Sequence, residues 1–151
     1  MANHYTFIGQ YSYQIDSKNR INLPSDFRKQ FKSSEKNTFV ITQGLDQSLW
    51  IYPINEWKKI EKELSSLSSI SKVNRSFLRN YLRNAKIIVF DKQGRFVLPE
   101  NLLNFAKISN NVSIIGVLNR IEIWNPEVLK KIDNEKIDHL LLDSLAEKVK
   151  I

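Results

Sequence analysis

The same motif occurs twice in the sequence, and this internal repeat limits the folds that the chain can adopt. Residues 14–27 read QIDSKNRINLPSDF, and residues 89–102 read VFDKQGRFVLPENL. Each copy contains an Asp, an Arg four positions later and a Pro four positions after the Arg. We therefore expect a fold of two similar halves. The matching pairs lie 75 residues apart: Asp16 and Asp91, Arg20 and Arg95, Leu23 and Leu98, and Pro24 and Pro99.

The repeat extends beyond the motif. Each copy is followed by a short helical pattern and then by a pattern of strand, turn and strand, which ends at an aromatic residue and a second Pro. Gly44 aligns with Gly116, and Pro53 with Pro126, so the four prolines fall into two matched pairs. Pro is favoured in the first turn of a helix, where its missing N–H is not needed. An internal duplication explains these matches better than chance does.

Apolar periodicity predicts eight short strands, four in each half. Between the halves, two amphipathic patterns predict a helix begun by Asn55 and a linking helix at about 71–84, begun by Ser71. A third pattern predicts a C-terminal helix at about 136–149, whose apolar side is expected to pack on the body or, as the alternative, to form an interface between copies. The strands are expected at residues 5–15, 20–23, 38–43, 48–52, 86–91, 95–98, 112–118 and 120–124.

The predicted fold class is α+β. Four short strands are too few for either half to close a sheet, whereas the two halves together could close one. We expect a small interleaved β-barrel built from two pseudo-symmetric halves, with added helices, in one compact domain over residues 1–151. The first internal repeat is placed at about 5–64 and the second at about 84–131.

Composition and charge exclude several classes of protein. The chain has no Cys, which excludes disulfides and thiolate metal sites and favours an intracellular protein. Its first residues, MANHYTFIGQ, lack the basic start and apolar centre of a signal peptide, and the apolar runs are too short to cross a bilayer. A net charge of +7 and a pI near 9.6 favour a polyanionic partner, most often nucleic acid.

The sequence indicates no catalytic, metal or cofactor site. The two histidines are His4 and His139, and His139 stands four residues before Asp143, but two ligands are too few for a zinc site. The four glycines are scattered, so no phosphate-binding loop is formed, and no Gly-x-Ser-x-Gly segment is present. We therefore expect no enzyme activity, no cofactor and no small-molecule substrate.

The repeated motif is read as a turn between two strands with a basic addition. An Asp at the start of a turn accepts hydrogen bonds from backbone N–H groups two residues later, and Gly94 or its counterpart Asn19 tolerates positive φ. These needs do not explain the Lys and Arg in each copy. The residues assigned to the structure of the turns are Asp16, Asp91, Gly94, Pro24 and Pro99.

Two interpretations of the basic residues are open. In the first, an Asp–Arg ion pair braces each turn and the Lys is solvated. In the second, the turns present Arg to DNA, because Arg binds guanine O6 and N7 bidentately and both cations neutralise phosphate. A further basic row follows one face of the linking helix and is interpreted as a solvated or interface surface. That row is Lys72, Arg75, Arg79 and Arg83.

These residues resemble the MraZ family of bacterial proteins, which have AbrB-like halves. The resemblance rests on the two motifs at 16–24 and 91–99, on LWIYPINEWKKIEKEL at 49–64 and on IEIWNPEVL at 121–129. It covers the chain from about Phe7 to about Leu129. Two departures stand out: the family usually has Gly where this chain has Asn19, and Lys92 lies one position before the usual basic residue, with Gln93 in its place.

The resemblance implies a sequence-specific regulator of transcription that acts on promoters of the division and cell-wall gene cluster. Its implied partners are double-stranded promoter DNA and further copies of itself in a ring, with no membrane, and its implied location is the cytoplasm, at the nucleoid. The alternative is an antitoxin-like or other protein-interaction module, although an antitoxin would normally carry a long disordered tail. The expected DNA contacts are Arg20, Arg95, Lys18, Lys92, Asn19 and Gln93.

Overall fold

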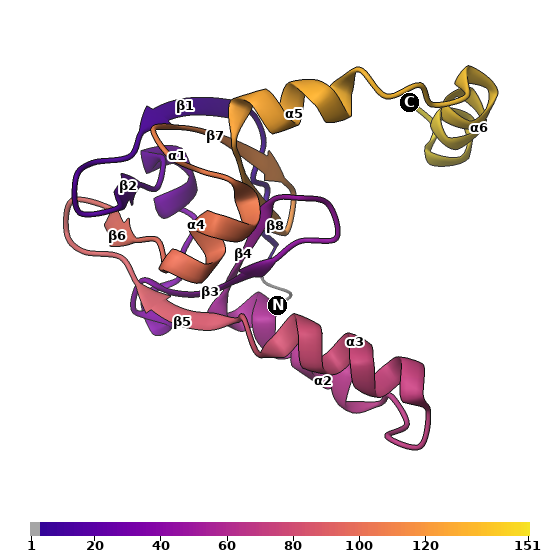
Figure 1. Cartoon of the computed structure of the whole chain (residues 1–151), viewed down its shortest axis with the longest axis horizontal. Helices are drawn as coiled ribbons and strands as arrows, with labels where there is room; N and C mark the ends of the chain where they lie inside the picture. Colours follow the sequence, from indigo (N-terminus) through magenta and orange to yellow (C-terminus); the bar gives the residue numbers. More distant parts are fainter. Residues whose placement is uncertain (1–3) are drawn as a thin grey trace.

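The computed structural model describes residues 4–151, which form an α+β fold, as predicted (Figure 1). The β-structure consists of a six-stranded antiparallel sheet and a separate two-stranded antiparallel ribbon. The strands are β1 (Gln10–Gln14), β2 (Arg20–Asn22), β3 (Thr38–Gln43), β4 (Leu49–Pro53), β5 (Lys86–Val89), β6 (Arg95–Val97), β7 (Asn111–Val117) and β8 (Arg120–Trp124).

The order of the strands reveals the predicted pseudo-symmetry. The sheet has the order β1-β7-β8-β4-β3-β5, and β2 pairs with β6 in the ribbon. The counterparts in the two halves are β1 and β5, β2 and β6, β3 and β7, and β4 and β8. When each strand of the sheet is replaced by its counterpart, the same order is obtained in reverse. The two halves are therefore related by an approximate twofold axis. This axis passes the centre of the ribbon, where Ile21 is paired with Phe96.

The two halves interleave, and the sheet stays open. Within the sheet, β1 of the first half pairs only with β7 of the second, and β5 of the second half pairs only with β3 of the first. The hydrogen-bonded strands are not closed into the predicted barrel, since β1 and β5 remain edge strands. These two edges run through the motif turns into β2 and β6, so the ribbon is joined to both ends of the sheet.

The ribbon is attached to the sheet by the main hydrophobic core. Ile21 and Phe96 point inward and are 2 % and 4 % exposed. The Phe96 ring packs edge-on against the Phe39 ring of β3, with 4.9 Å between the ring centroids. Burial of a side chain of this size stabilises a fold by about 1.5–3 kcal/mol. The neighbouring residues of the ribbon, which alternate with this inward pair, therefore face outward.

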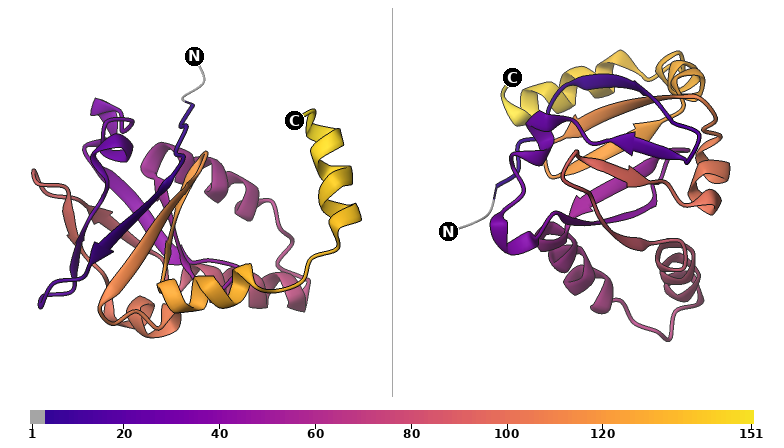
Figure 2. Two further views of the ribbon diagram at one scale, coloured as in Figure 1. Left: turned by 90° about the horizontal axis from the view of Figure 1, so that it is seen from above. Right: turned by 90° about the vertical axis from the view of Figure 1, so that its left-hand side faces the viewer.

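The described residues include six α-helices and a 3-10 helix (Ser33–Glu35). The helices are α1 (Ser25–Arg28), α2 (Ile54–Ser65), α3 (Lys72–Leu82), α4 (Glu100–Ala106), α5 (Pro126–Asp133) and α6 (His139–Val149). Pro24 and Pro99 are the N-caps of α1 and α4, so each motif ends in a helix start. As Figures 1 and 2 show, α2 and α3 form a hairpin on one side, whereas α5 and α6 extend from another.

The α2–α3 hairpin packs on the outer face of β3 and β4. Val40 and Tyr52 of these strands form a second buried cluster with Trp57 of α2 and Tyr81 of α3. The Thr42 hydroxyl also donates to the carbonyl oxygen of Tyr81 at 2.8 Å, which ties the end of α3 to the sheet. Because β3 is buried on both faces, its sequence reads as a continuous apolar run instead of an alternation.

Several element ends differ from the predictions. The helix predicted to begin with Asn55 starts at Ile54, after the N-cap Pro53. The first strand begins at Gln10 instead of residue 5, because Gly9 has a φ of +94°, which interrupts the extended backbone. The second pair of prolines is not equivalent in position. Pro53 is the N-cap of α2, whereas Pro126 is the first residue of α5 and follows the N-cap Asn125. This difference in position goes with the shorter spacing between Pro53 and Pro126 than between Pro24 and Pro99.

The prediction for the C-terminal helix is wrong in one respect. The helix α6 exists, and it begins at His139 after the N-cap Asp138, whose side chain accepts a hydrogen bond from the N–H of Leu140 at 2.9 Å. It does not pack on the body, because Leu141 and Leu145 are 67 % and 57 % exposed. Its apolar side is therefore uncovered within one chain.

We expect that a fragment of residues 1–71 cannot fold as a monomer. It would lose β7 and β6, the only strands that pair with β1 and β2, and the hairpin that it keeps is too small to be stable alone. Circular dichroism and sedimentation should find it unfolded, or dimerised to replace the missing half. A soluble monomer that melts cooperatively would contradict the interdependence of the halves.

Candidate nucleic-acid interface

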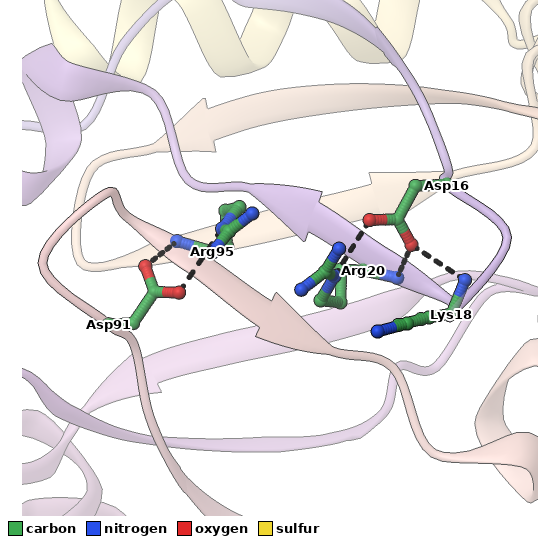
Figure 3. A network of polar contacts seen from close by, with 5 residues as sticks. All are labelled: Asp16, Lys18, Arg20, Asp91 and Arg95. Atoms are coloured by element: carbon green, nitrogen blue, oxygen red, sulfur yellow. Dashed lines mark hydrogen bonds and ion pairs between the residues drawn. The ribbon is translucent and has the colours of Figure 1, made fainter.

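The first motif turn is built around the carboxylate of Asp16 (Figure 3). Its Oδ1 accepts hydrogen bonds from the backbone N–H groups of Lys18 and Arg20, both at 2.9 Å. The chain reverses through Asn19, whose φ is 59° and whose N–H donates to the Asp16 carbonyl oxygen at 3.0 Å. These bonds favour the charged carboxylate, and the backbone N–H of Arg20 contributes most to holding the pKa of Asp16 below its ordinary value.

The second turn repeats this arrangement around Asp91. The carboxylate Oδ1 accepts from the N–H groups of Gln93 and Arg95 at 2.9 Å each, and the pKa of Asp91 is lowered mainly by the Arg95 N–H. Gly94 has a φ of +81°. A Cβ atom there would lie within 2.6 Å of three atoms of the Arg28 side chain, so a larger residue would force this flexible side chain to move.

The two turns differ in where their lysines stand. The backbone N–H bonded to the Asp carboxylate belongs to Lys18 in the first turn and to Gln93 in the second. Gln93 is therefore the structural counterpart of Lys18, and Lys92 occupies the place of Ser17. All of the predicted contact residues lie in or directly beside the turns, but the two lysines extend from different turn positions.

Each turn is also bonded to the other half of the chain. The N–H of Leu23 donates to the carbonyl oxygen of Gly94, and the N–H of Leu98 donates to that of Asn19, both at 2.8 Å. This reciprocal pair of backbone hydrogen bonds continues the ribbon beyond β2 and β6. The turns are consequently held in a fixed arrangement relative to each other.

Arg20 and Arg95 form the ion pairs that the first interpretation expected. Arg20 Nε lies 2.7 Å from Asp16 Oδ2, and Arg95 Nε lies 3.2 Å from Asp91 Oδ2. Among residues 4–151, the two terminal nitrogens of each guanidinium have no hydrogen-bond partner. These terminal nitrogens are still available for a bidentate contact. The ion pair and a contact to an acceptor such as guanine are thus compatible.

The ribbon places both arginines on one face. Arg20 is paired with Val97 and Arg95 with Asn22, and these four residues alternate with the inward pair. Figure 3 shows Arg20 and Arg95 between the two aspartates, near the middle of the ribbon. Diagonal neighbours of an antiparallel pair lie about 7–8 Å apart, which is close to two base-pair steps of roughly 3.4 Å. We call this outward side of residues 20–22 and 95–97 the ribbon face.

Sequence reasoning missed Arg28. This residue of α1 donates from Nε to the carbonyl oxygen of Leu23 at 2.9 Å and lies against Gly94 of the second turn. Its counterpart at the repeat offset is Leu103, so a search for repeated cations does not find it. The sequence gives only a weaker indication of Arg28, namely its position one helical turn after Pro24. Arg28 adds a cation beside the second turn only.

The described residues meet the requirements of neither a metal site of His, Asp and Glu side chains nor a membrane-spanning helix. No group of three or more His, Asp or Glu side chains within residues 4–151 could hold a metal ion, and His139 and Asp143 are both exposed on α6. His4 is exposed as well. No helix in this part of the chain is long and apolar enough to cross a membrane.

Comparison with known sequences decides the family. A sequence profile described as "MraZ protein, putative antitoxin-like" matches the chain twice, over residues 6–80 and 81–144. The chain belongs to the MraZ family. The resemblance drawn from the repeated motif is confirmed, and the second MraZ match extends beyond Leu129 into α6.

The relatives are named for one activity. "Transcriptional regulator MraZ" of Clostridium tetani is 41 % identical over 143 residues, which is 95 % of this chain and 96 % of the relative. Proteins of the same name from Halothermothrix orenii and Pediococcus pentosaceus are 44 % and 43 % identical over 119 residues, or 79 % of this chain and 80 % of each relative. MraZ is thus a family of transcriptional regulators and not a family of enzymes.

We expect Asp16→Ala to lower the melting temperature more than Asp16→Asn does. Asn keeps an oxygen that can accept the two backbone N–H groups and loses only the ion pair, whereas Ala loses both. Thermal melts of the two variants and the wild type at neutral pH would measure the difference. Equal melting temperatures for the two variants would show that the backbone bonds do not hold the turn.

The difference in stability between the wild type and Asp16→Asn should also depend on pH. The pKa of Asp16 is lowered in the folded protein, so its charged form contributes stability above the unfolded pKa of about 3.9. That contribution is lost as the pH falls through the folded value. The stability gap between wild type and Asp16→Asn should therefore be full near pH 7 and shrink below about pH 4. A gap that grows on acidification would refute this assignment.

Proposed function

We propose that the protein is a sequence-specific regulator of transcription that reads double-stranded promoter DNA with the ribbon face. The observation that carries the proposal is the pair Arg20 and Arg95, which share one face and whose terminal guanidinium nitrogens have no hydrogen-bond partner within residues 4–151. The major groove of B-DNA admits a two-stranded β-ribbon, and other β-ribbon proteins read DNA in this way.

The ion pairs support this role through orientation. An Arg that grips guanine O6 and N7 needs a planar fork aimed at the base edge. Asp16 and Asp91 hold the Nε side of each guanidinium and thereby direct the fork outward. Because the side chain is already ordered in the free protein, less conformational entropy is lost on binding.

The remaining turn residues are assigned to the flanks of the contact. Lys18 and Lys92 would neutralise phosphates, which gives affinity without sequence information. Asn19 and Gln93, at the tips of the turns, would bind the sugar-phosphate backbone or a base edge through their amides. Since Gln93 replaces a cation, the second turn would contact fewer phosphates at this position than the first.

The cellular setting follows from the family. We propose a cytoplasmic, nucleoid-associated protein that acts on promoters of the division and cell-wall gene cluster. We further propose that several copies form a ring, so that several ribbon faces engage repeated short DNA boxes. Linked contacts of this kind raise affinity through effective concentration.

An antitoxin-like interaction module is the second candidate. It is favoured by the words of the family description and by the exposed apolar side of α6, which resembles a surface for a protein partner. The two candidates separate when promoter binding and pull-down are measured on the same variants. An interaction module would keep its partner when Arg20 and Arg95 are replaced, and its DNA binding would be weak in the wild type.

We expect Arg20→Ala and Arg95→Ala each to weaken promoter binding by about 1–3 kcal/mol per binding subunit, because each removes one base contact. Lys58→Ala is the control, since this exposed cation lies on α2, away from the ribbon and from α3. Titration of a labelled promoter duplex, with thermal melts alongside, would test this. Wild-type affinity in both variants would end the ribbon-face proposal, and a collapse in melting temperature would favour a purely structural ion pair.

We also expect tight binding to require at least two properly spaced boxes. One chain neutralises few phosphates, and each contributes about −0.9 to the slope of log affinity against log salt concentration. A duplex with several boxes should therefore show a steeper slope and a higher affinity than a one-box duplex. Equal affinity for both duplexes, from a protein that stays monomeric, would exclude the multivalent mechanism.

A further inference from the structure

The C-terminal helix α6 leaves its apolar side in solvent. Leu141, Leu145 and Val149 recur every four residues and therefore lie on one face, which Leu142 extends. These four side chains are between 46 % and 67 % exposed. Figure 1 shows α6 away from the sheet, at the far end of α5. Short helices owe most of their stability to packing of the apolar face, so this one is expected to be covered by a partner.

A groove of matching character lies between α3 and the loop that follows β3. Its volume is about 410 Å³, and the residues that line it include Val73, Phe77 and Tyr81 on α3 and Gly44 and Leu45 in the loop. Val73 and Leu45 are 77 % and 73 % exposed, so the groove is open and largely apolar, with Gln43, Ser76 and Asn80 as its polar lining. We call it the α3 groove. Figure 1 shows α3 and α6 of one chain well apart, with α3 in the lower part of the view and α6 in the upper part.

The two surfaces carry opposite charge. The segment around the α3 groove, residues 72–86, contains five basic residues and no acidic residue. The segment from Asp133 to the end of α6, residues 133–149, contains five carboxylates against two Lys. Complementary charge favours an encounter between the surfaces and selects against contacts between like surfaces. The basic residues are Lys72, Arg75, Arg79, Arg83 and Lys86, and the acidic ones are Asp133, Glu135, Asp138, Asp143 and Glu147.

We propose that α6 of one copy docks in the α3 groove of a second copy. Every copy then offers one helix and one groove, so the contact is head-to-tail, and such contacts close into a ring when the rotation between neighbours permits. The inference rests on the proposed function, because it names the surfaces that join the copies of that assembly. It also gives the basic row of α3 a place beside an acidic helix.

The test is the mass in solution of full-length variants. Leu145→Glu places a charge on the apolar face of α6, and Val73→Glu places one in the α3 groove. Each variant should fall from the mass of the wild-type oligomer to that of the protomer. Mixed in equal amounts, they retain one intact helix and one intact groove, and should form a heterodimer of twice the protomer mass. Leu140→Glu, on the other side of α6, is the matched control and should keep the wild-type mass.

Three results would overturn the proposal: a monomeric wild type, wild-type mass in both variants, or a mixture that stays at the protomer mass. A monomeric wild type is also the result if α6 folds onto its own groove or binds a different protein. Leu45→Glu gives a second groove variant from another segment, should Val73→Glu melt early. Binding of a one-box duplex should be unchanged in all of these variants, so failure of the assembly and failure of the ribbon face are separate readouts.

Discussion

The structure depends on the exchange of backbone hydrogen bonds between the two motif copies. Leu23 bonds to the turn of the second half, and Leu98 bonds to the turn of the first. Beneath these bonds, Phe96 packs on Phe39, so the ribbon cannot leave the sheet without exposing the core. Both turns are therefore fixed to the buried core, although they lie on the surface.

The aspartates connect this framework to the arginines. One carboxylate oxygen of each Asp closes the turn through two backbone N–H groups, while the other holds an Arg by its Nε. Surface ion pairs contribute little to stability in general. Here the pair has a second effect, since it fixes the direction of a long and otherwise flexible side chain. The two interpretations of the motif are compatible, because the ion pair uses Nε of each guanidinium and a further contact would use its terminal nitrogens.

Local features of the fold were readable from the sequence. The repeat, the eight strands, the helix starts at Pro24 and Pro99 and the capping of α3 by Ser71 all follow from short-range patterns. The open sheet and the position of Arg28 do not, because they arise only when the halves interleave and bring distant residues together. The periodicity of α6 showed that a face should be covered, but not by what. The DNA contacts assigned to Arg20 and Arg95 stay predictions.

Joining both halves in one chain has a consequence for how the turns can change. In an assembly of two identical short chains, any substitution in a turn would appear twice, and both sides would change together. Here each turn is encoded separately, and the two turns differ in sequence. Gly94 stands at the position that corresponds to Asn19, and Leu103 stands at the position that corresponds to Arg28. With both halves in one chain, a substitution can therefore change one turn while the other stays as it is.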